Sequence, residues 1–467
     1  MALKLFNTLT RTVQDFVPLD PHTKKVGLYC CGPTVYDFGH IGNFRTFVFA
    51  DLLRRHLDFR GYDVQHVMNI TDVEDKIIGR VGQAGTTLRD YTSRYETAFL
   101  DDLQALSCLR PHQLPRATDY IAEMIQLIEA LMKRDIAYRA PDGSVYFSIE
   151  KYQGCGCRYG QLVNLNFDQM RVGERVATDE YTKESLADFA LWKARVPADG
   201  AVFWPSPWGE GRPGWHIECS AMSMKLLGPS FDLHLGGEDL AFPHHEDEIA
   251  QSEGATGRPF VKYWLHGAHL LVEGKKMSKS LGNFYTLRDL LGKGFSGREI
   301  RFLLLSAHYR ESFNFMLDGL QGARGALGRL DECLSKLNDA AGPTSAAPDP
   351  EVLQRFTAAL DDDLNISAAW GTVFEWVREA NRQLSQNQCS PERAAAALAT
   401  WQQMDRVFGL GRAGAAEVPA EIQALLEQRQ AARAAKDFRR ADALRDDLKA
   451  KGWAIEDTPK GARLKGL

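Results

Sequence analysis

Short apolar runs alternate with longer amphipathic segments over the first hundred residues. Residues 26–31 form an apolar run of the length of a buried strand, and residues 64–70, apolar at four of seven positions, are consistent with a second strand. Between them, residues 43–59 place an apolar side chain at every third or fourth position, which predicts an amphipathic helix that ends before Gly61. A strand, a helix and a second strand in this order predict one half of a doubly wound, nucleotide-binding α/β fold.

The same alternation resumes near residue 211, and from residue 298 onward the pattern is almost wholly helical. We therefore expect an α/β fold: a Rossmann-like parallel-sheet catalytic domain with an insertion, then a helical domain and a small mixed C-terminal segment. The predicted boundaries are 1–107 and 206–270 for the two halves of the catalytic domain, 108–205 for the insertion, 271–320 for a lysine-rich loop region, 321–415 for a helical bundle and 416–467 for a basic C-terminal segment.

Composition is typical of a globular protein, with 44% hydrophobic and 25% charged residues and a net charge of -5 over 467 residues. The first residues lack the apolar core of a signal peptide, and no apolar run approaches the ~18 residues of a membrane span. Eight scattered cysteines do not form a disulfide pattern. We expect a cytoplasmic protein without a membrane partner, monomeric by default, whose clustered cysteines are metal ligands or free thiols.

Two motifs more than 200 residues apart suit a nucleotide. His40-Ile41-Gly42-Asn43 stands at the start of the first predicted helix, where free backbone N–H groups favour a phosphate and Gly42 permits close approach. Residues 276–280, KMSKS, place two lysines on a loop rich in small residues, and lysines neutralise polyphosphates. Taken singly, each has a commoner explanation, as a capping histidine or a solvated loop. Their co-occurrence favours a nucleotide site.

Thiol, imidazole and carboxylate groups provide a candidate metal site. His244 and Glu248 are four residues apart and share one helical face, and zinc accepts these ligand types in tetrahedral sets of four. Spacing does not choose between Cys30 and Cys31, or between His244 and His245. Successive strand residues point to opposite faces, so only one of the two cysteines can serve. Two buried cysteines and a surface helix are the simpler alternative.

The two nucleotide motifs resemble the HIGH and KMSKS signatures of the class I aminoacyl-tRNA synthetases. The second is identical, and the first differs at Asn43, which can hydrogen-bond but carries no charge. The resemblance implies that His40 and Asn43 contact the ATP phosphates while Lys276 and Lys279 neutralise charge during attack by the amino-acid carboxylate, with Mg²⁺ alongside ATP. Residues 236–240, GGEDL, resemble the adenosine-binding element. The implied ATP-binding residues are Gly42, Gly236, Gly237, Asp239, Met277, Ser278 and Lys279.

Five further stretches, CCGPTVYD, NITDVEDKI, GRPGWHIECSAM, FPHHEDEIAQS and KDFRRADALRDDL, resemble the cysteinyl-tRNA synthetase family over nearly the whole chain. The resemblance implies one Zn²⁺ per subunit that binds the substrate thiolate, which separates L-cysteine from serine by chemistry rather than by shape. The implied zinc ligands are Cys31, Cys219, His244 and Glu248. The implied amino-acid pocket contains Gly32, Thr71, Trp215 and His234.

The C-terminal segment is basic, since residues 421–467 hold 11 Lys or Arg against 8 Asp or Glu. The resemblance implies tRNA(Cys) with a GCA anticodon as a partner, and a solvated amphipathic helix is the alternative interpretation. The implied anticodon contacts are Arg433, Asp442, Arg445 and Asp457. The expected reaction joins cysteine to tRNA through a cysteinyl-adenylate. Two rivals stay open: a ligase that couples cysteine to an amino-sugar, and an inactive RNA-binding paralogue. We interpret Cys155 and Cys157 as free thiols.

Overall fold

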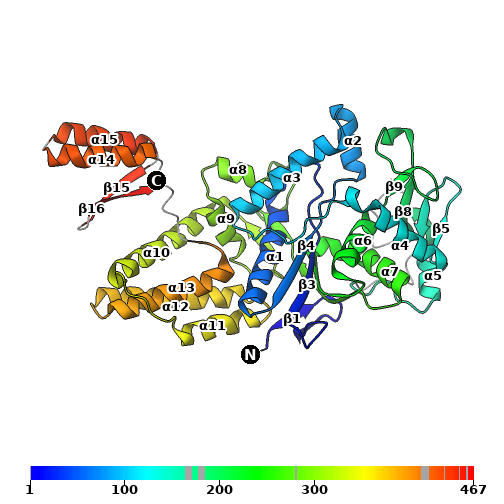
Figure 1. Ribbon diagram of the computed structural model, residues 1–467, viewed down its shortest axis with the longest axis horizontal. Coiled ribbons are helices and arrows are strands. Elements are labelled where there is room, and N and C mark those ends of the chain that lie inside the picture. The colour runs from blue at the N-terminus through cyan, green and yellow to red at the C-terminus, as the bar shows by residue number, and fades with distance from the viewer. Residues whose placement is uncertain are drawn as a thin grey trace. The chain divides into compact units, whose positions relative to one another are not determined.

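The computed structural model describes residues 2–163, 171–176, 185–278, 281–411, 420–435, 437–451, 453–458 and 461–466 (Figure 1). It contains two compact units, Met1–Leu410 and Gly411–Leu467.

A four-stranded parallel sheet in the order β11-β10-β3-β4 forms the centre of the first unit. Strands β3 (Lys25–Cys30) and β4 (Asp63–Met68) precede the insertion, and β10 (Phe231–Gly237) and β11 (Val261–Gly267) follow it. The two halves meet where β3 pairs with β10 in parallel. This confirms the predicted class of fold. The predicted strand at 64–70 ends earlier, at Met68, because the chain turns there to bring Asn69 against the end of β3.

Helices cover both faces of this sheet. Helix α1 (Ile41–Phe59) lies on one side of β3 and β4, and α6 (Trp215–Leu227) and α7 (Glu246–Thr256) lie on the other (Figure 1). Apolar side chains along α1, among them Phe44, Val48, Leu52 and Leu57, are buried in the main apolar core. Helices α2 (Asp75–Ala84) and α3 (Leu88–Ala105) follow β4, and a hairpin of β1 (Lys4–Asn7) and β2 (Thr12–Asp15) begins the chain.

The insertion packs against α6 and α7. It contains α4 (Ile121–Lys133), α5 (Ile149–Gly154), β5 (Ala137–Arg139), β6 (Val145–Phe147), β7 (Arg171–Val176) and β8 (Ser185–Ala194). These strands form a small sheet with β9 (Gly211–Pro213), which follows the predicted insertion and pairs with β8. The apolar core of the insertion includes Ile217 from α6 and Ala250 from α7. The Glu246 carboxylate accepts three backbone N–H groups, from residues 160–162, at 2.7 to 2.9 Å. The insertion therefore holds the start of α7 in place.

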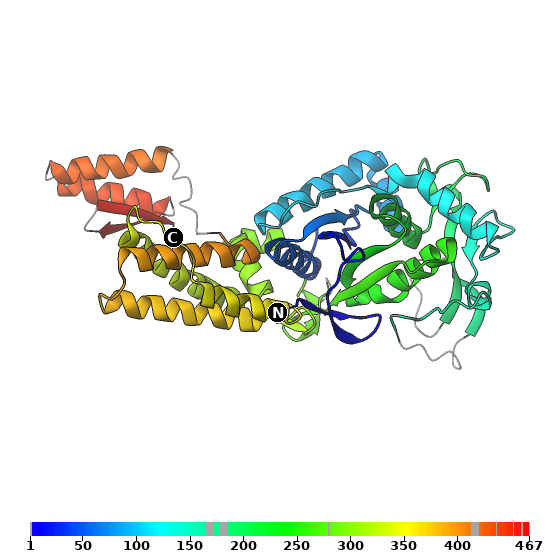
Figure 2. The ribbon, with the colours of Figure 1, turned by 60° about the horizontal axis from the view of Figure 1, so that its bottom comes forward.

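A second small sheet leads into the helical bundle. Strands β12 (Leu270–Val272), β13 (Lys275–Lys276) and β14 (Phe313–Phe315) surround α8 (Leu287–Gly292) and α9 (Gly297–Leu304) in sequence. The bundle comprises α10 (Leu317–Ala341), α11 (Pro350–Asp361), α12 (Ile366–Ser385) and α13 (Pro391–Phe408), side by side in Figure 2. Its apolar core is continuous with that of α1 and the parallel sheet, so bundle and catalytic domain share one interior.

The second unit is a helix pair with a hairpin. It contains α14 (Ala420–Ala434), α15 (Phe438–Ala450) and the antiparallel strands β15 (Trp453–Thr458) and β16 (Gly461–Gly466). Its core includes Ile422, Leu426, Leu444 and Leu448. Across both units, none of the described helices has the length and apolar character needed to cross a membrane.

His66 on β4 makes the fold sensitive to acid. Its ring is fully buried, and burial lowers the pKa of His66 to about 3. In the unfolded chain His66 has an ordinary pKa of ~6.5 and binds a proton below that pH, whereas in the folded state it stays neutral. The contribution of His66 to the unfolding free energy is therefore fully present above pH ~6.5 and is lost as the pH falls toward 3. Between pH 7.5 and 5.0, the unfolding free energy of the wild type is expected to fall by about 2 kcal/mol more than that of His66→Leu, because the variant lacks the titrating ring. Urea unfolding at both pH values measures this, with the exposed His22→Gln as the control.

Candidate functional site

The four predicted metal ligands come together at the carboxyl end of the parallel sheet. Cys31 follows β3, Cys219 lies on α6, and His244 and Glu248 bracket the first turn of α7. One ligand atom from each lies within 4.8 Å of the others, and all four residues are buried. The simpler alternative of a surface helix is wrong, since Glu246, Asp247 and Glu248 are all fully buried.

The structure chooses between the two adjacent cysteines. The Cys31 sulfur lies 3.9 Å from that of Cys219 and 3.8 Å from a Glu248 oxygen. Cys30 instead packs into the main apolar core, with its sulfur 3.5 Å from the Cys31 carbonyl oxygen. Only Cys31 therefore reaches the cluster.

Both histidines of the pair approach the cluster, and a second overlapping set contains Cys31, His234, His245 and Glu248. His244 Nε2 lies 3.2 Å from Glu248 Oε1, and His245 Nε2 lies 3.4 Å from the Cys31 sulfur. The first set offers two thiols, one imidazole and one carboxylate, and zinc accepts these ligands in sites of four. The residues present thus fit a zinc ion, and the set with two sulfur ligands suits it better.

Burial opposes negative charge on these ligands when no cation is present. It raises the pKa of the Cys31 thiol well above its ordinary value, and neighbouring Cys219 adds to the shift. Burial also raises the pKa of Glu248, with Cys219 again contributing. A bound divalent cation reverses this balance, because a coordinated thiol is deprotonated. A bound cation would therefore favour the ionised form of these ligands.

Three further histidines, His216, His234 and His266, lie around the cluster. The sequence predicted only His234 of these. His216 Nδ1 lies 2.8 Å from His244 Nδ1, and His266 Nε2 lies 2.8 Å from His245 Nδ1. Such contacts orient ligand imidazoles. The packing of α6 on α7 brings His216 to His244, and the pairing of β10 with β11, which sets Gly236 opposite His266, brings His266 to His245. No periodicity in the sequence carries that signal.

The predicted amino-acid pocket lies beside the cluster in part. Trp215, the first residue of α6, is half-buried with its ring centroid 4.5 Å from that of His244. His234 is fully buried, and its Nε2 lies 3.0 Å from a Glu248 oxygen, so it contacts one of the predicted metal ligands. Gly32 is explained by packing: a Cβ there would lie 1.7 Å from the Asn69 carbonyl oxygen. Asn69 also accepts the Gly32 N–H and donates to the buried Thr71 hydroxyl.

His40 and Asn43 cap the first turn of α1 reciprocally. His40 Nδ1 accepts the Asn43 N–H at 3.2 Å, and Asn43 Oδ1 accepts the His40 N–H at 3.1 Å. An acceptor Nδ1 implies that the neutral ring carries its proton on Nε2. Burial lowers the pKa of His40, which favours that neutral form. The atoms left for a phosphate are therefore His40 Nε2–H and the Asn43 amide NH₂.

The lysine loop touches this same turn. A Cβ on Gly42 would lie 2.8 Å from Met277 Cε, so the glycine permits the two motifs to meet. Lys276 is exposed on β13, and the Ser278 N–H donates to Asn283 Oδ1 at 2.9 Å. Lys279 lies outside the described residues.

The GGEDL element lies between the metal cluster and α1. A Cβ on Gly236 would lie 2.7 Å from His245 Cε1, and one on Gly237 would lie 2.3 Å from Asp239 Oδ1. Asp239 is exposed in a short 3₁₀ turn, Glu238–Leu240, where its carboxylate is open to solvent. Strand β10 thus places His234 beside the cluster. Two residues later, Gly236 and Gly237 leave the end of the strand next to α1 without side chains.

The predicted anticodon residues all belong to the second unit. Arg433 lies near the end of α14, and Asp442 and Arg445 lie three residues apart on α15, all three exposed. Asp457 lies on β15 opposite Ala462. Elsewhere, Cys155 is exposed and Cys157 half-buried, and among the described residues neither belongs to a metal-compatible cluster.

Comparison with known families divides the chain into three matched regions. Residues 17–325 match the tRNA synthetases class I (C) catalytic domain, residues 355–412 the DALR domain, and residues 415–463 the cysteinyl-tRNA ligase anticodon binding domain.

Similar proteins and structures agree with these matches. The chain is 48% identical over 483 residues to a cysteine–tRNA ligase of Chlamydia muridarum, covering all of both chains, and 45% identical over 474 residues to that of Protochlamydia amoebophila, covering all of this chain and 98% of the other. Methionyl-tRNA synthetase of Mycobacterium tuberculosis, solved with methionyl-adenylate, shares the fold at a TM-score of 0.60 and 15% identity over 83% of this chain and 90% of that one. Identity of this extent along the full length shows that the chain belongs to the cysteine–tRNA ligase family of class I aminoacyl-tRNA synthetases.

Proposed function

We propose that this protein ligates L-cysteine to tRNA(Cys) in two steps. The cysteine carboxylate attacks the α-phosphate of ATP, which releases pyrophosphate and forms cysteinyl-adenylate. The 3′-terminal adenosine of the tRNA then accepts the cysteinyl group. The observation that carries the proposal is a buried cluster of two cysteines, a histidine and a glutamate at the sheet edge that also carries the helix start at His40.

Selection of cysteine depends on Cys31, Cys219, His244 and Glu248, which we propose hold one Zn²⁺. Zinc, when bound there, supplies a Lewis acid that prefers a thiolate to a serine hydroxyl. The protein's part is to hold four ligands in fixed orientations, with His216 and His234 contacting two of them. Trp215, Thr71 and Gly32 are proposed to bound the rest of the amino acid.

Activation of cysteine by ATP depends on hydrogen-bond donors and positive charges that stabilise the negative charge developing on the phosphates in the transition state. We assign phosphate contacts to His40 and Asn43, and charge neutralisation to Lys276 and Lys279. We propose that further residues complete the ATP site with Mg²⁺, the glycines by permitting close approach and Asp239 as a ribose acceptor: Gly42, Gly236, Gly237, Asp239, Met277 and Ser278.

Recognition of tRNA is assigned to the second unit. Arginine and exposed carboxylates suit unstacked anticodon bases, which are recognised along their edges. We propose that Arg433, Asp442, Arg445 and Asp457 contact a GCA anticodon. We also propose that the enzyme is a monomer and that its domains follow the six residue ranges given above. The DALR and anticodon-binding matches support an RNA-binding role for this end of the chain.

Cysteine-dependent exchange of pyrophosphate with ATP, followed by charging of tRNA, tests the function. The purified protein is expected to catalyse exchange with cysteine at least ~10⁴-fold better than with serine, in kcat/KM. It should then charge a tRNA with a GCA anticodon and not one with a changed anticodon base. Exchange without charging would support the small-molecule ligase, and no exchange would contradict both ligase readings.

A further inference from the structure

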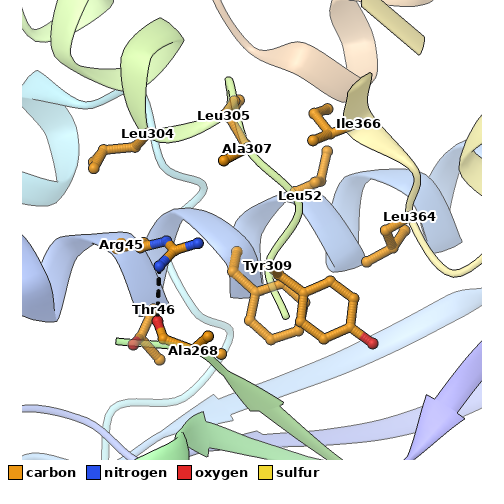
Figure 3. Close-up of a pocket in the computed structure, with 12 residues that line it drawn as sticks. Arg45, Thr46, Leu52, Ala268, Leu304, Leu305, Ala307, Tyr309, Leu364 and Ile366 are labelled. Atoms are coloured by element: carbon orange, nitrogen blue, oxygen red, sulfur yellow. Dashed lines mark hydrogen bonds between the residues drawn. The ribbon is translucent and has the colours of Figure 1, made fainter. Parts of the chain in front are cut away.

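Arg45 is a buried arginine that stands two residues after Asn43 on α1, with 5% of its surface exposed. Its guanidinium donates to four main-chain carbonyl oxygens. Nη1 reaches Ala268 and His269 at 2.8 Å each, and Nη2 reaches His308 at 3.1 Å and also Glu311. Figure 3 shows Arg45 extending from α1 to Ala268. Neither of the reciprocal caps at His40 and Asn43 involves this side chain.

The four carbonyls belong to two loops that lead into the small sheet of the lysine loop. Residues 268–269 connect β11 to β12, and residues 305–312 connect α9 to β14. The loops bond to each other, since the Ala268 N–H donates to Tyr309 O at 2.8 Å. Strands β12 and β14 then pair in parallel, and β12 turns back into β13, which carries Lys276. Arg45 therefore holds the root of the lysine loop.

The Arg45 guanidinium is buried, so water has little access to replace its hydrogen bonds to the carbonyl oxygens. Burial lowers the pKa of Arg45 to about 10, so the group stays charged at neutral pH, and Glu238 and Glu311 oppose the shift only in part. Beside it lies a cavity of about 20 Å³, lined in part by Leu52, Leu304 and Ile366 (Figure 3), which has room for about one water molecule. The planar guanidinium spreads its donors over four carbonyl oxygens on two loops, whereas the compact ammonium of lysine has only three donors.

The same loop also meets α1 at two other places. Met277 contacts Gly42, and the Ile41 N–H donates to Tyr285 O at 3.0 Å, beyond the lysine motif. The tip and the far end of the loop thus bind the first turn of α1, while its root is bound through Arg45. One helix turn therefore carries the proposed phosphate donors, and the next carries the attachment of the proposed lysine.

We propose that Arg45 is a positioning residue for adenylation, which fixes the sheet carrying Lys276 at the correct distance from His40 and Asn43. This inference rests on the proposed function, because it requires ATP to bind between the two motifs. Arg45 itself acts through the loop and not on the nucleotide. A misplacement of ~1 Å in such a site lowers the rate by about 10²-fold.

Arg45→Lys, Lys276→Ala and the double variant test the proposal in full-length protein. Arg45→Lys is expected to lower kcat for cysteine-dependent exchange about 10²-fold, with zinc content and the transfer of cysteine from preformed cysteinyl-adenylate to tRNA unchanged. If both residues act through one loop, the double variant falls no more than about threefold below the worse single variant. Arg55→Lys is the matched control, since Arg55 also lies on α1 and donates to a carbonyl, that of Ser107. It should exchange within about threefold of the wild type.

Phe313→Leu decides the matter if the Arg45 variant fails to fold. The ring is only partly buried, and the Arg45 guanidinium lies over it at 5.4 Å. This variant is expected to lose about fivefold in exchange and nothing in transfer. Losses that multiply in the double variant, or wild-type exchange by Arg45→Lys or by a folded Phe313→Leu, would overturn the inference. An inactive wild type would instead contradict the proposed function.

Discussion

Replacing Cys31 by serine is expected to lower kcat/KM for cysteine in pyrophosphate exchange by about 10³-fold or more and to remove the bound zinc. The sulfur of Cys31 lies within reach of Cys219 and Glu248 in a buried cluster, and a serine hydroxyl is a far weaker zinc ligand than a thiolate. Metal analysis of the purified variant and exchange kinetics measure the two effects together.

Cys30→Ser is the matched control because the two cysteines are adjacent and both buried. Cys30 faces the main apolar core, where a hydroxyl can keep the contact to the Cys31 carbonyl oxygen. We expect Cys30→Ser to retain zinc and to stay within about threefold of wild-type exchange, at a modest cost in stability. Equal losses in both variants would mean that the thiols act through folding rather than as ligands.

Lys276→Ala is expected to lower kcat for exchange by about 10² to 10³-fold, because a fixed charge at the developing negative charge of the transition state is removed. Lys276 is exposed on β13, so its loss should leave the melting temperature, the zinc content and the KM for cysteine unchanged. Exchange kinetics at saturating and limiting ATP separate the effect on the chemical step from the effect on binding.

Lys275→Ala provides the comparison for this prediction. It changes the same net charge on the same two-residue strand, and Lys275 is also exposed. We expect it to remain within about threefold of the wild type, since neighbouring strand residues point to opposite sides. If both alanine variants lost activity equally, general electrostatic attraction of ATP would account for the data better than a defined contact.

The sequence predicted the split parallel sheet because short, mostly apolar segments alternate with a segment, α1, that has helical periodicity. It also placed Cys31, Cys219, His244 and Glu248 in one site, through resemblance to a family, and the structure brings these four together. Spacing alone left Cys30 and Cys31 equivalent. The choice depends on which side of β3 faces α6, which is a property of the fold.

Other features depend on contacts between residues far apart in sequence. His216 and His266 join the cluster only through the packing of α6 on α7 and the register of β10 with β11. The role of Gly32 was assigned to substrate, whereas the approach of Asn69 already requires a glycine there. Arg45 gave no signal at all, because its partners are main-chain carbonyls, which every residue carries.

X-ray absorption at the zinc edge tests the central claim, that a zinc ion held by Cys31, Cys219, His244 and Glu248 selects cysteine through its thiolate. The protein loaded with one zinc should show two sulfur neighbours at ~2.3 Å, from the two cysteines of the cluster. Addition of L-cysteine is expected to raise this count to three, and serine should leave it at two. A sulfur count that L-cysteine does not change would contradict the account.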